Sequence, residues 1–253
     1  MKKLLIIPLF LSITNFTNAA TNNDTATRGD IEIIKSSENI RVLSNEIMKD
    51  YILSYLGKNT SEDISVSISN ISKELRSISK HTNKESTKAL IDFLTYNKSE
   101  LKKVIKSKPS EEDIYELIDY VESFIEGSKS IFKGHKYSFS ENEKMLMKSK
   151  DMSALLDEIY IYYFISRLNT ESNHYSKKLN SSINKYSLEL SDISKFNYPD
   201  ELKQVVGSLD NQWNANKIIL SDKKDISIPL ILNDLNEYES TEIQKLTDFH
   251  NKN

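Results

Sequence analysis

Apolar residues recur every three or four positions along most of this chain, and that spacing is typical of amphipathic α-helices. The clearest stretch runs from Glu38 to Gly57, where Ile40, Ile47 and Tyr51 lie on one apolar stripe. A second stretch of similar build, Met152–Leu168, begins about a hundred residues later. No segment alternates between apolar and polar residues for long enough to predict a strand. The pattern therefore predicts an all-α fold.

Helix start signals divide the chain into segments. Ser110 precedes three acidic residues, which favours a helix N-terminus, because a side-chain oxygen can cap free backbone amides and acidic groups suit the positive end of the helix dipole. Ser140 and Glu143 have the spacing of a capping box before a later helix. Thr60 or Ser61 is expected to cap another helix. Together with the apolar stripes, these signals predict about eight helices.

The predicted helices fall into two similar series. We expect one bundle over residues 31–253, duplicated as repeats at about 31–135 and 140–253. Short connections predict that neighbouring helices are antiparallel and pack as a bundle. Trp213 lies on the apolar stripe of the seventh predicted helix, so we expect it to be buried.

The first thirty residues differ from the rest of the chain. Residues 1–20 combine a basic start, a short apolar run and small residues, which is the pattern of a secretory signal peptide. The apolar run is shorter than the roughly 20 residues that span a bilayer, although an uncleaved anchor is the alternative. Residues 21–30 are polar without apolar periodicity and predict a flexible N-terminus. We therefore expect export across the inner membrane to the periplasm.

Composition argues against several classes of protein. The chain has no cysteine, so the fold cannot depend on disulfides. Charged residues make up 28% of the chain but the net charge is only -3, because lysine alternates with acidic residues along nearly every segment. A nucleic-acid-binding protein would present a basic patch or stripe. Nucleic acid is therefore not an expected partner.

Catalytic and metal-binding motifs are not evident. The sequence has no glycine-rich phosphate loop, no nucleophile elbow and no pair of histidines with metal-ligand spacing. The four histidines are far apart, at predicted helix ends or near the chain end, and solvent-facing positions explain them; they are His81, His135, His174 and His250. We expect neither an enzyme nor a cofactor or metal site.

The segment from Arg41 to Ile52 reads RVLSNEIMKDYI. It resembles the R-M-L-S-Q-R-I-A-K-x-Y-L signature of the N-terminal domain of type IV pilus methyl-accepting chemotaxis transducers (PilJ-type), to which periplasmic domains of nitrate/nitrite sensor kinases have a related signature. The matching residues are Arg41, Leu43, Ser44, Ile47, Lys49 and Tyr51. Asn45 replaces the usual glutamine and Glu46 a second arginine. The family repeats the signature about a hundred residues on, where Met152–Phe164 keeps the apolar face without an arginine.

The resemblance implies a helical sensor domain that binds a small ligand. It implies Arg41, Ser44 and Asn45 as ligand-binding residues, with a small anion as the ligand. Family members have flanking membrane helices and signalling modules. We expect neither in this protein, and hence a free-standing domain whose partner is a membrane-bound receptor or kinase.

Arg41 admits two interpretations. A guanidinium on the inner stripe of a helix is costly unless it is paired, and its planar fork suits an oxyanion. The alternative is an ion pair with Glu38, three residues earlier, or with Asp157 or Glu158. The acidic Glu46 in place of the second arginine favours the ion pair, because it would repel an anion.

Two further groups of residues bear on the site. Lys49 is expected to be solvated, two turns from Arg41. Tyrosines gather in the two stretches described above, Glu38–Gly57 and Met152–Leu168; they are Tyr51, Tyr55, Tyr160, Tyr162 and Tyr163. Core packing with hydroxyls at the rim is favoured for them over a ligand cage.

Two functions from different classes follow. The first is an exported ligand-binding or sensor-type helical domain. The second is a secreted structural or host-interaction protein with no small-molecule site. A buried, polar-lined pocket around Arg41 would favour the first, and a dry core with Arg41 paired at the surface would favour the second.

Overall fold

The computed structural model describes residues 28–168, 173–221 and 228–252. Within those ranges the chain forms eight α-helices and no strand, so the predicted all-α bundle is confirmed. The helices are α1 (Arg28–Tyr55), α2 (Ser61–His81), α3 (Glu85–Val104), α4 (Glu111–Lys133), α5 (Glu141–Leu168), α6 (Asn173–Ile193), α7 (Asp200–Ser221) and α8 (Ile228–Lys252). The predicted signal peptide and residues 21–27 lie outside the described residues.

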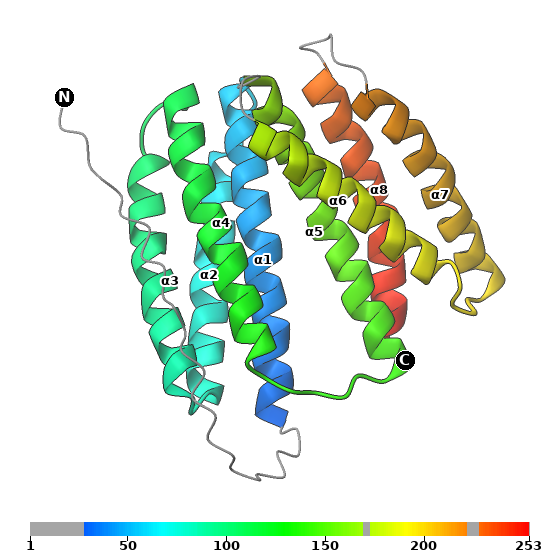
Figure 1. Ribbon diagram of the computed structural model, residues 1–253, viewed down its shortest axis with the longest axis horizontal. Coiled ribbons are helices and arrows are strands. Elements are labelled where there is room, and N and C mark those ends of the chain that lie inside the picture. The colour runs from blue at the N-terminus through cyan, green and yellow to red at the C-terminus, as the bar shows by residue number, and fades with distance from the viewer. Residues whose placement is uncertain (1–27, 169–172, 222–227, 253) are drawn as a thin grey trace.

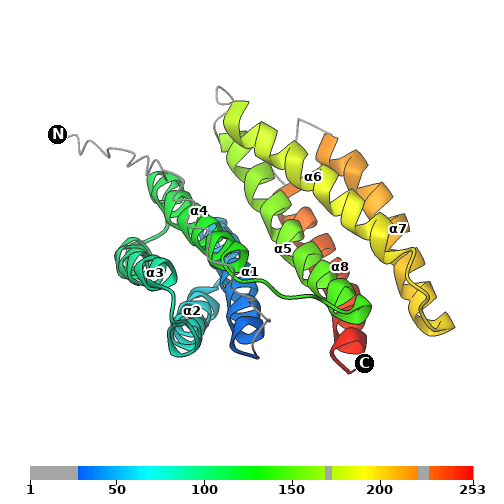
Figure 2. The same ribbon diagram turned by 60° about the horizontal axis from the view of Figure 1, so that its bottom comes forward.

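The helices form two groups, which we call the first half (α1–α4) and the second half (α5–α8) (Figures 1 and 2). In the first half α1 packs against both α2 and α4, and α3 packs against α4. In the second half α5 packs against both α6 and α8, and α7 packs against α8. The principal contact between the halves is the one between α1 and α5. Whether the halves are a duplication remains a prediction.

The local signals at helix starts are largely confirmed. The Asp113 amide donates to the Ser110 hydroxyl at 3.2 Å, so Ser110 caps α4. The capping box before α5 is complete, because the Ser140 amide donates to the Glu143 carboxylate at 2.8 Å and the Glu143 amide donates to the Ser140 hydroxyl at 3.3 Å. Thr60 precedes α2 but makes no side-chain cap, since its hydroxyl donates to the Asp50 carbonyl at 2.6 Å.

Helix α1 begins at Arg28, three residues before the predicted start. Asp30 lies in its first turn, where a carboxylate suits the helix dipole, and it contacts His135 Nδ1 at 2.6 Å. The prediction that the histidines face solvent is therefore wrong for His135, which is 6% exposed. It is wrong also for His250, which is buried against Tyr198 with the hydroxyl 2.8 Å from Nε2. Long-range partners bury both rings.

The core runs through both halves and includes the aromatic side chains predicted for it. Trp213 is 2% exposed, which confirms its predicted burial. Tyr160 and Tyr163 are buried as well, whereas Tyr55 is 36% exposed. The Tyr51 hydroxyl donates to Asp113 at 3.2 Å, but the buried hydroxyl of Tyr160 has no hydrogen-bond partner among the described residues. No described helix is both long enough and apolar enough to cross a bilayer.

The second half also buries a carboxylate. Glu239 on α8 is fully buried, and it accepts hydrogen bonds from the Tyr186 hydroxyl at 2.9 Å and from Asn216 Nδ2 at 2.5 Å. Burial disfavours the charged form, so the pKa of Glu239 rises from its usual 4.5 to about 7 although both hydrogen bonds lower it. The folded protein therefore holds a proton that the unfolded chain releases at lower pH.

This difference predicts a pH dependence of stability. The folded state binds the Glu239 proton more tightly, so its contribution is fully present below the unfolded pKa of 4.5 and is lost as the pH rises through about 7. The loss should approach about 3 kcal/mol. Urea unfolding at pH 5 and pH 8 measures it. Glu239→Gln should show a smaller difference between the two pH values than wild type, whereas the exposed Glu116→Gln should match wild type. Equal pH dependence in Glu239→Gln and wild type would contradict this assignment.

Candidate ligand site between the two halves

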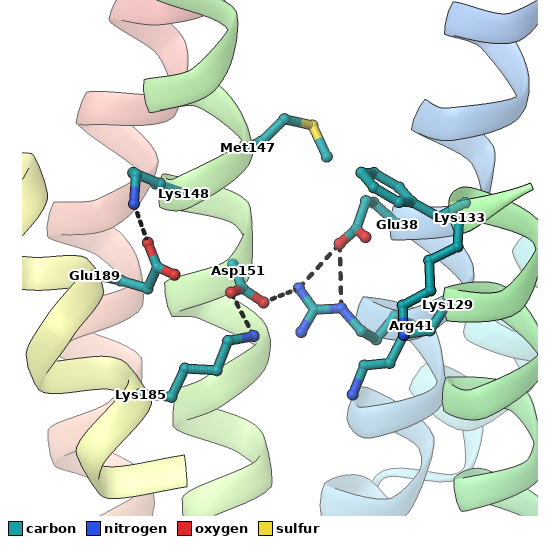
Figure 3. Close-up of a pocket in the computed structure, with 10 residues that line it drawn as sticks. Glu38, Arg41, Lys129, Lys133, Met147, Lys148, Asp151, Lys185 and Glu189 are labelled. Atoms are coloured by element: carbon teal, nitrogen blue, oxygen red, sulfur yellow. Dashed lines mark hydrogen bonds and ion pairs between the residues drawn. The ribbon is translucent and has the colours of Figure 1, made fainter. Parts of the chain in front are cut away.

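The contact between α1 and α5 brings together residues that are far apart in sequence. Asn45 Nδ2 donates to the Ala154 carbonyl at 3.0 Å, and Lys49 Nζ donates to Asp157 at 2.9 Å. These pairs are separated by 109 and 108 positions, and the near-constant separation means that α1 and α5 run parallel, as Figure 1 shows. Arg41, one turn before Asn45, faces Asp151 in the same register (Figure 3).

Arg41 is buried and surrounded by carboxylates, with only 2% of the residue exposed. Its Nε and Nη2 atoms lie 3.1 and 2.9 Å from one carboxylate oxygen of Glu38, and Nη2 also pairs with Asp151. The Nη1 atom lies 3.8 Å from Glu158 Oε1. Burial lowers the pKa of Arg41, but these three carboxylates together raise it above its usual value. The guanidinium therefore stays charged.

The partners of Arg41 match the sequence prediction in part. The pair with Glu38 was predicted, and Glu158 is within ion-pair distance. Asp157 is not a partner of Arg41, because it pairs with Lys49 on the other side of the contact between α1 and α5. Asp151 was missed. Asp151 immediately precedes the second stretch, Met152–Leu168, and only the parallel register of α1 and α5 brings it to Arg41.

Ser44 and Asn45, the other predicted ligand-binding residues, are buried where α1 contacts α5. The Ser44 hydroxyl donates to the Ile40 carbonyl of its own helix at 2.6 Å. Asn45 contacts the Ala154 carbonyl through Nδ2, while its buried Oδ1 has no hydrogen-bond partner among the described residues. A cavity opens beside Arg41 between the two halves, and neither Ser44 nor Asn45 lines it. The structure therefore places only Arg41 of the three at that cavity.

Lys49 and Glu46 lie on the side of the α1–α5 contact that is opposite to Arg41. Lys49 was predicted to be solvated, but its side chain is 19% exposed and pairs with Asp157, because α5 brings that carboxylate into reach. Glu46 accepts a hydrogen bond from Ser67 at 3.2 Å, and burial followed by the nearby Asp157 charge raises the pKa of Glu46. Glu46 is therefore not among the ion-pair partners of Arg41, and its charge does not compete with a ligand bound at Arg41.

A cavity of about 310 Å³ opens at Arg41 between the halves. Four helices line it, with Arg41 and Glu38 from α1, Lys129 and Lys133 from α4, and Asp151 from α5 among its residues (Figure 3). Helix α6 supplies the fourth wall. Five basic and three acidic residues line the cavity, so the charge around it is slightly positive, although most of the exposed surface of its wall is apolar. The sensor interpretation requires a buried, polar-lined pocket; this cavity has charged residues around it but is open and largely apolar, and Arg41 itself is already paired.

The cations of this cavity differ in how they are paired. Lys185 on α6 contacts Asp151 at 2.6 Å. Burial alone would raise the pKa of Asp151, but the charges of Arg41 and Lys185 outweigh it and hold that pKa below its usual value. In contrast, Lys129 and Lys133 are exposed and form no ion pair with the described part of the chain. They are the cations free to meet a ligand.

A second cavity, of about 230 Å³, adjoins the first along α4, since Lys129 lines both. Glu158 lines this second cavity, and its Oε2 atom accepts a hydrogen bond from the Ser182 hydroxyl at 3.2 Å. Among the described residues, neither its buried Oε1 atom nor the buried Nη1 atom of Arg41 has a hydrogen-bond partner. These two buried atoms form an ion pair at 3.8 Å, too long for a hydrogen bond; Arg41 lines the first cavity and Glu158 the second.

The described residues hold no group of three or more histidine, aspartate or glutamate side chains arranged to bind a metal ion. Comparisons with protein-family models, with curated proteins and with solved structures find no match for this chain. The geometry between the halves is therefore the basis for assigning a function.

Proposed function

We propose that this chain is a binding module of the sensor type, without catalytic activity, that takes a small polar ligand into the cavities between its halves. The observation that carries the proposal is the pair of buried atoms Arg41 Nη1 and Glu158 Oε1, which lie at ion-pair distance from each other but make no hydrogen bond with the described residues, on side chains that line two adjoining cavities. Buried polar atoms are nearly always hydrogen-bonded, and leaving charged ones unsatisfied is costly. A ligand that reaches them would remove that cost.

The arrangement of the halves suggests how binding could be transmitted. A ligand between α4 and α6 would contact both halves, whereas the principal existing contact between them is the one between α1 and α5. Such a ligand would favour the arrangement in which α4 and α6 lie closest, which is a shift of population between arrangements. In this proposal the protein is exported to the periplasm, and a membrane-bound receptor or kinase reads the change.

The structural alternative also has an observation in its favour. Glu38 and Asp151 already neutralise two edges of the Arg41 guanidinium, so the bundle is held together without a ligand. A secreted structural or host-interaction protein could have the same ion pairs. The two functions differ in whether a small molecule stabilises the fold.

A thermal-shift screen tests the proposal. The probes are sodium nitrate, sodium phosphate, sodium acetate, glycine, L-alanine and ethylamine. A ligand at a hundred times its Kd adds about 2.7 kcal/mol, which in a chain of this size raises Tm by roughly 5–10 °C. We expect at least one probe to raise the Tm of wild type.

Two lysine variants provide the control. Lys129 lines both cavities and forms no ion pair with the described residues, so Lys129→Gln should fold normally and show a smaller shift. Lys217 is exposed on α7, which lines neither cavity, and Lys217→Gln should respond as wild type does. If no probe raises the Tm of wild type, or if both variants respond alike, the structural alternative is the better description.

A further inference from the structure

We infer that the ligand is a zwitterion, an α-amino acid or a small molecule with the same two charged groups, which bind Arg41 Nη1 and Glu158 Oε1 side by side. This inference rests on the proposed function and specifies its ligand. The carboxylate of the ligand would accept hydrogen bonds from Arg41, with Lys129 beside it. The ammonium group would donate to Glu158.

The charges around Arg41 disfavour a simple anion. Glu38, Asp151 and Glu158 all lie within ion-pair distance of the guanidinium. An anion bound to Nη1 would stand next to the Glu158 carboxylate, whose Oε1 atom is only 3.8 Å from Nη1. Repulsion by that carboxylate opposes the attraction of the arginine, so a bare oxyanion gains little.

The same surroundings disfavour a simple cation. A cation bound to Glu158 Oε1 would stand next to Arg41, and Lys129 lines the same cavity as Glu158. Lys185 lies close to the first cavity as well, on Asp151. A zwitterion avoids both problems, because it brings one charge of each sign and leaves the net charge of the site unchanged.

The geometry also suits the two groups of an amino acid. The carboxylate and the ammonium group of an α-amino acid are attached to one carbon atom, so they can satisfy opposite charges that lie only a few ångströms apart. Other residues already orient both protein groups. Glu38 and Asp151 contact the Nε and Nη2 atoms of Arg41, and the Ser182 hydroxyl donates to the Oε2 atom of Glu158. Such preorganisation reduces the entropy lost on binding.

The side chain of the ligand would have room in the larger cavity. That cavity has a volume of about 310 Å³ and includes Phe132 and Met147 among its lining residues. Its volume is within the range of small-molecule sites, roughly 300–1,000 Å³. A water molecule bridging Nη1 and Oε1 would satisfy the same two atoms without any ligand, and the experiment separates that case.

The experiment compares L-alanine with two analogues that each lack one charge. Propionate has no ammonium group, and ethylamine has no carboxylate; glycine, L-serine, L-methionine and L-aspartate extend the set of amino acids. Isothermal titration calorimetry on the full chain measures each Kd. We expect at least one amino acid to bind, and propionate and ethylamine to bind at least about tenfold more weakly than L-alanine or not at all.

Variants test the assignment of the two atoms. Glu158→Gln keeps the size of the side chain and removes its charge, so it should weaken amino-acid binding about tenfold or more. Glu239→Gln changes a buried glutamate elsewhere in the second half and should leave the Kd unchanged. Far-UV circular dichroism confirms that both variants are folded.

The possible outcomes are distinct. If propionate binds as tightly as the amino acids, the zwitterion assignment is overturned while the proposed binding function stands. If ethylamine binds as tightly, the carboxylate is not needed and the assignment is likewise overturned. If no probe binds, a water molecule or nothing occupies the site, and both the inference and the proposed function fail.

Discussion

Replacing Arg41 with alanine is expected to lower the free energy of unfolding by about 3–5 kcal/mol, because it removes one partner of a buried charge network. The residue is 2% exposed, and its loss would leave Glu38, Asp151 and Glu158 close together, offset in part by Lys185 and Lys129. Urea unfolding followed by far-UV circular dichroism measures the change. The halves meet mainly through α1 and α5, so the loss should also weaken their association.

The control for this prediction is Arg76 on α2. Arg76 is exposed and forms no ion pair with the described residues, so Arg76→Ala should change stability by less than about 0.5 kcal/mol. Arg41→Lys keeps the charge but not the planar fork that contacts Glu38 and Asp151, so its stability should lie between wild type and Arg41→Ala. An Arg41→Ala protein as stable as Arg76→Ala would show that the network contributes nothing to the fold.

Replacing Trp213 with alanine is expected to cost about 3–5 kcal/mol, because it leaves a large cavity in the core of the second half. The indole is 2% exposed and its ring lies 4.3 Å from the Tyr186 ring, centroid to centroid. Its Nε1 donates to the Ser187 hydroxyl at 2.8 Å. Both partners are on α6, so Trp213 holds α7 against α6 as well as filling the core.

The measurement must not depend on tryptophan fluorescence, because Trp213 is the only tryptophan of the chain. Circular dichroism avoids that difficulty. Trp213→Phe keeps most of the apolar volume but loses the hydrogen bond to Ser187, so it should cost less than Trp213→Ala. A Trp213→Ala protein that melts within a few degrees of wild type would contradict this account of the core.

The helices could be predicted from the sequence because the signals that form them are local. The cap at Ser110 and the capping box of Ser140 and Glu143 involve residues three positions apart, and the structure has both. The burial of Trp213 follows from its place on an apolar stripe, and such a stripe must face a core whatever that core contains. These features do not depend on which helices become neighbours.

The candidate site could be predicted only in part, for the same reason. Arg41 stood out as a cation on an apolar stripe, and its pair with Glu38 is a local contact within one helix. Its contact with Asp151 joins two helices, and it exists because α1 and α5 run parallel in one register. An apolar stripe determines which face of a helix is buried, but not how far the helix is shifted along its neighbour. The sequence thus determined the helices and the buried arginine. The tertiary structure decided which charges surround that arginine, because those charges come from distant segments whose relative position only packing sets.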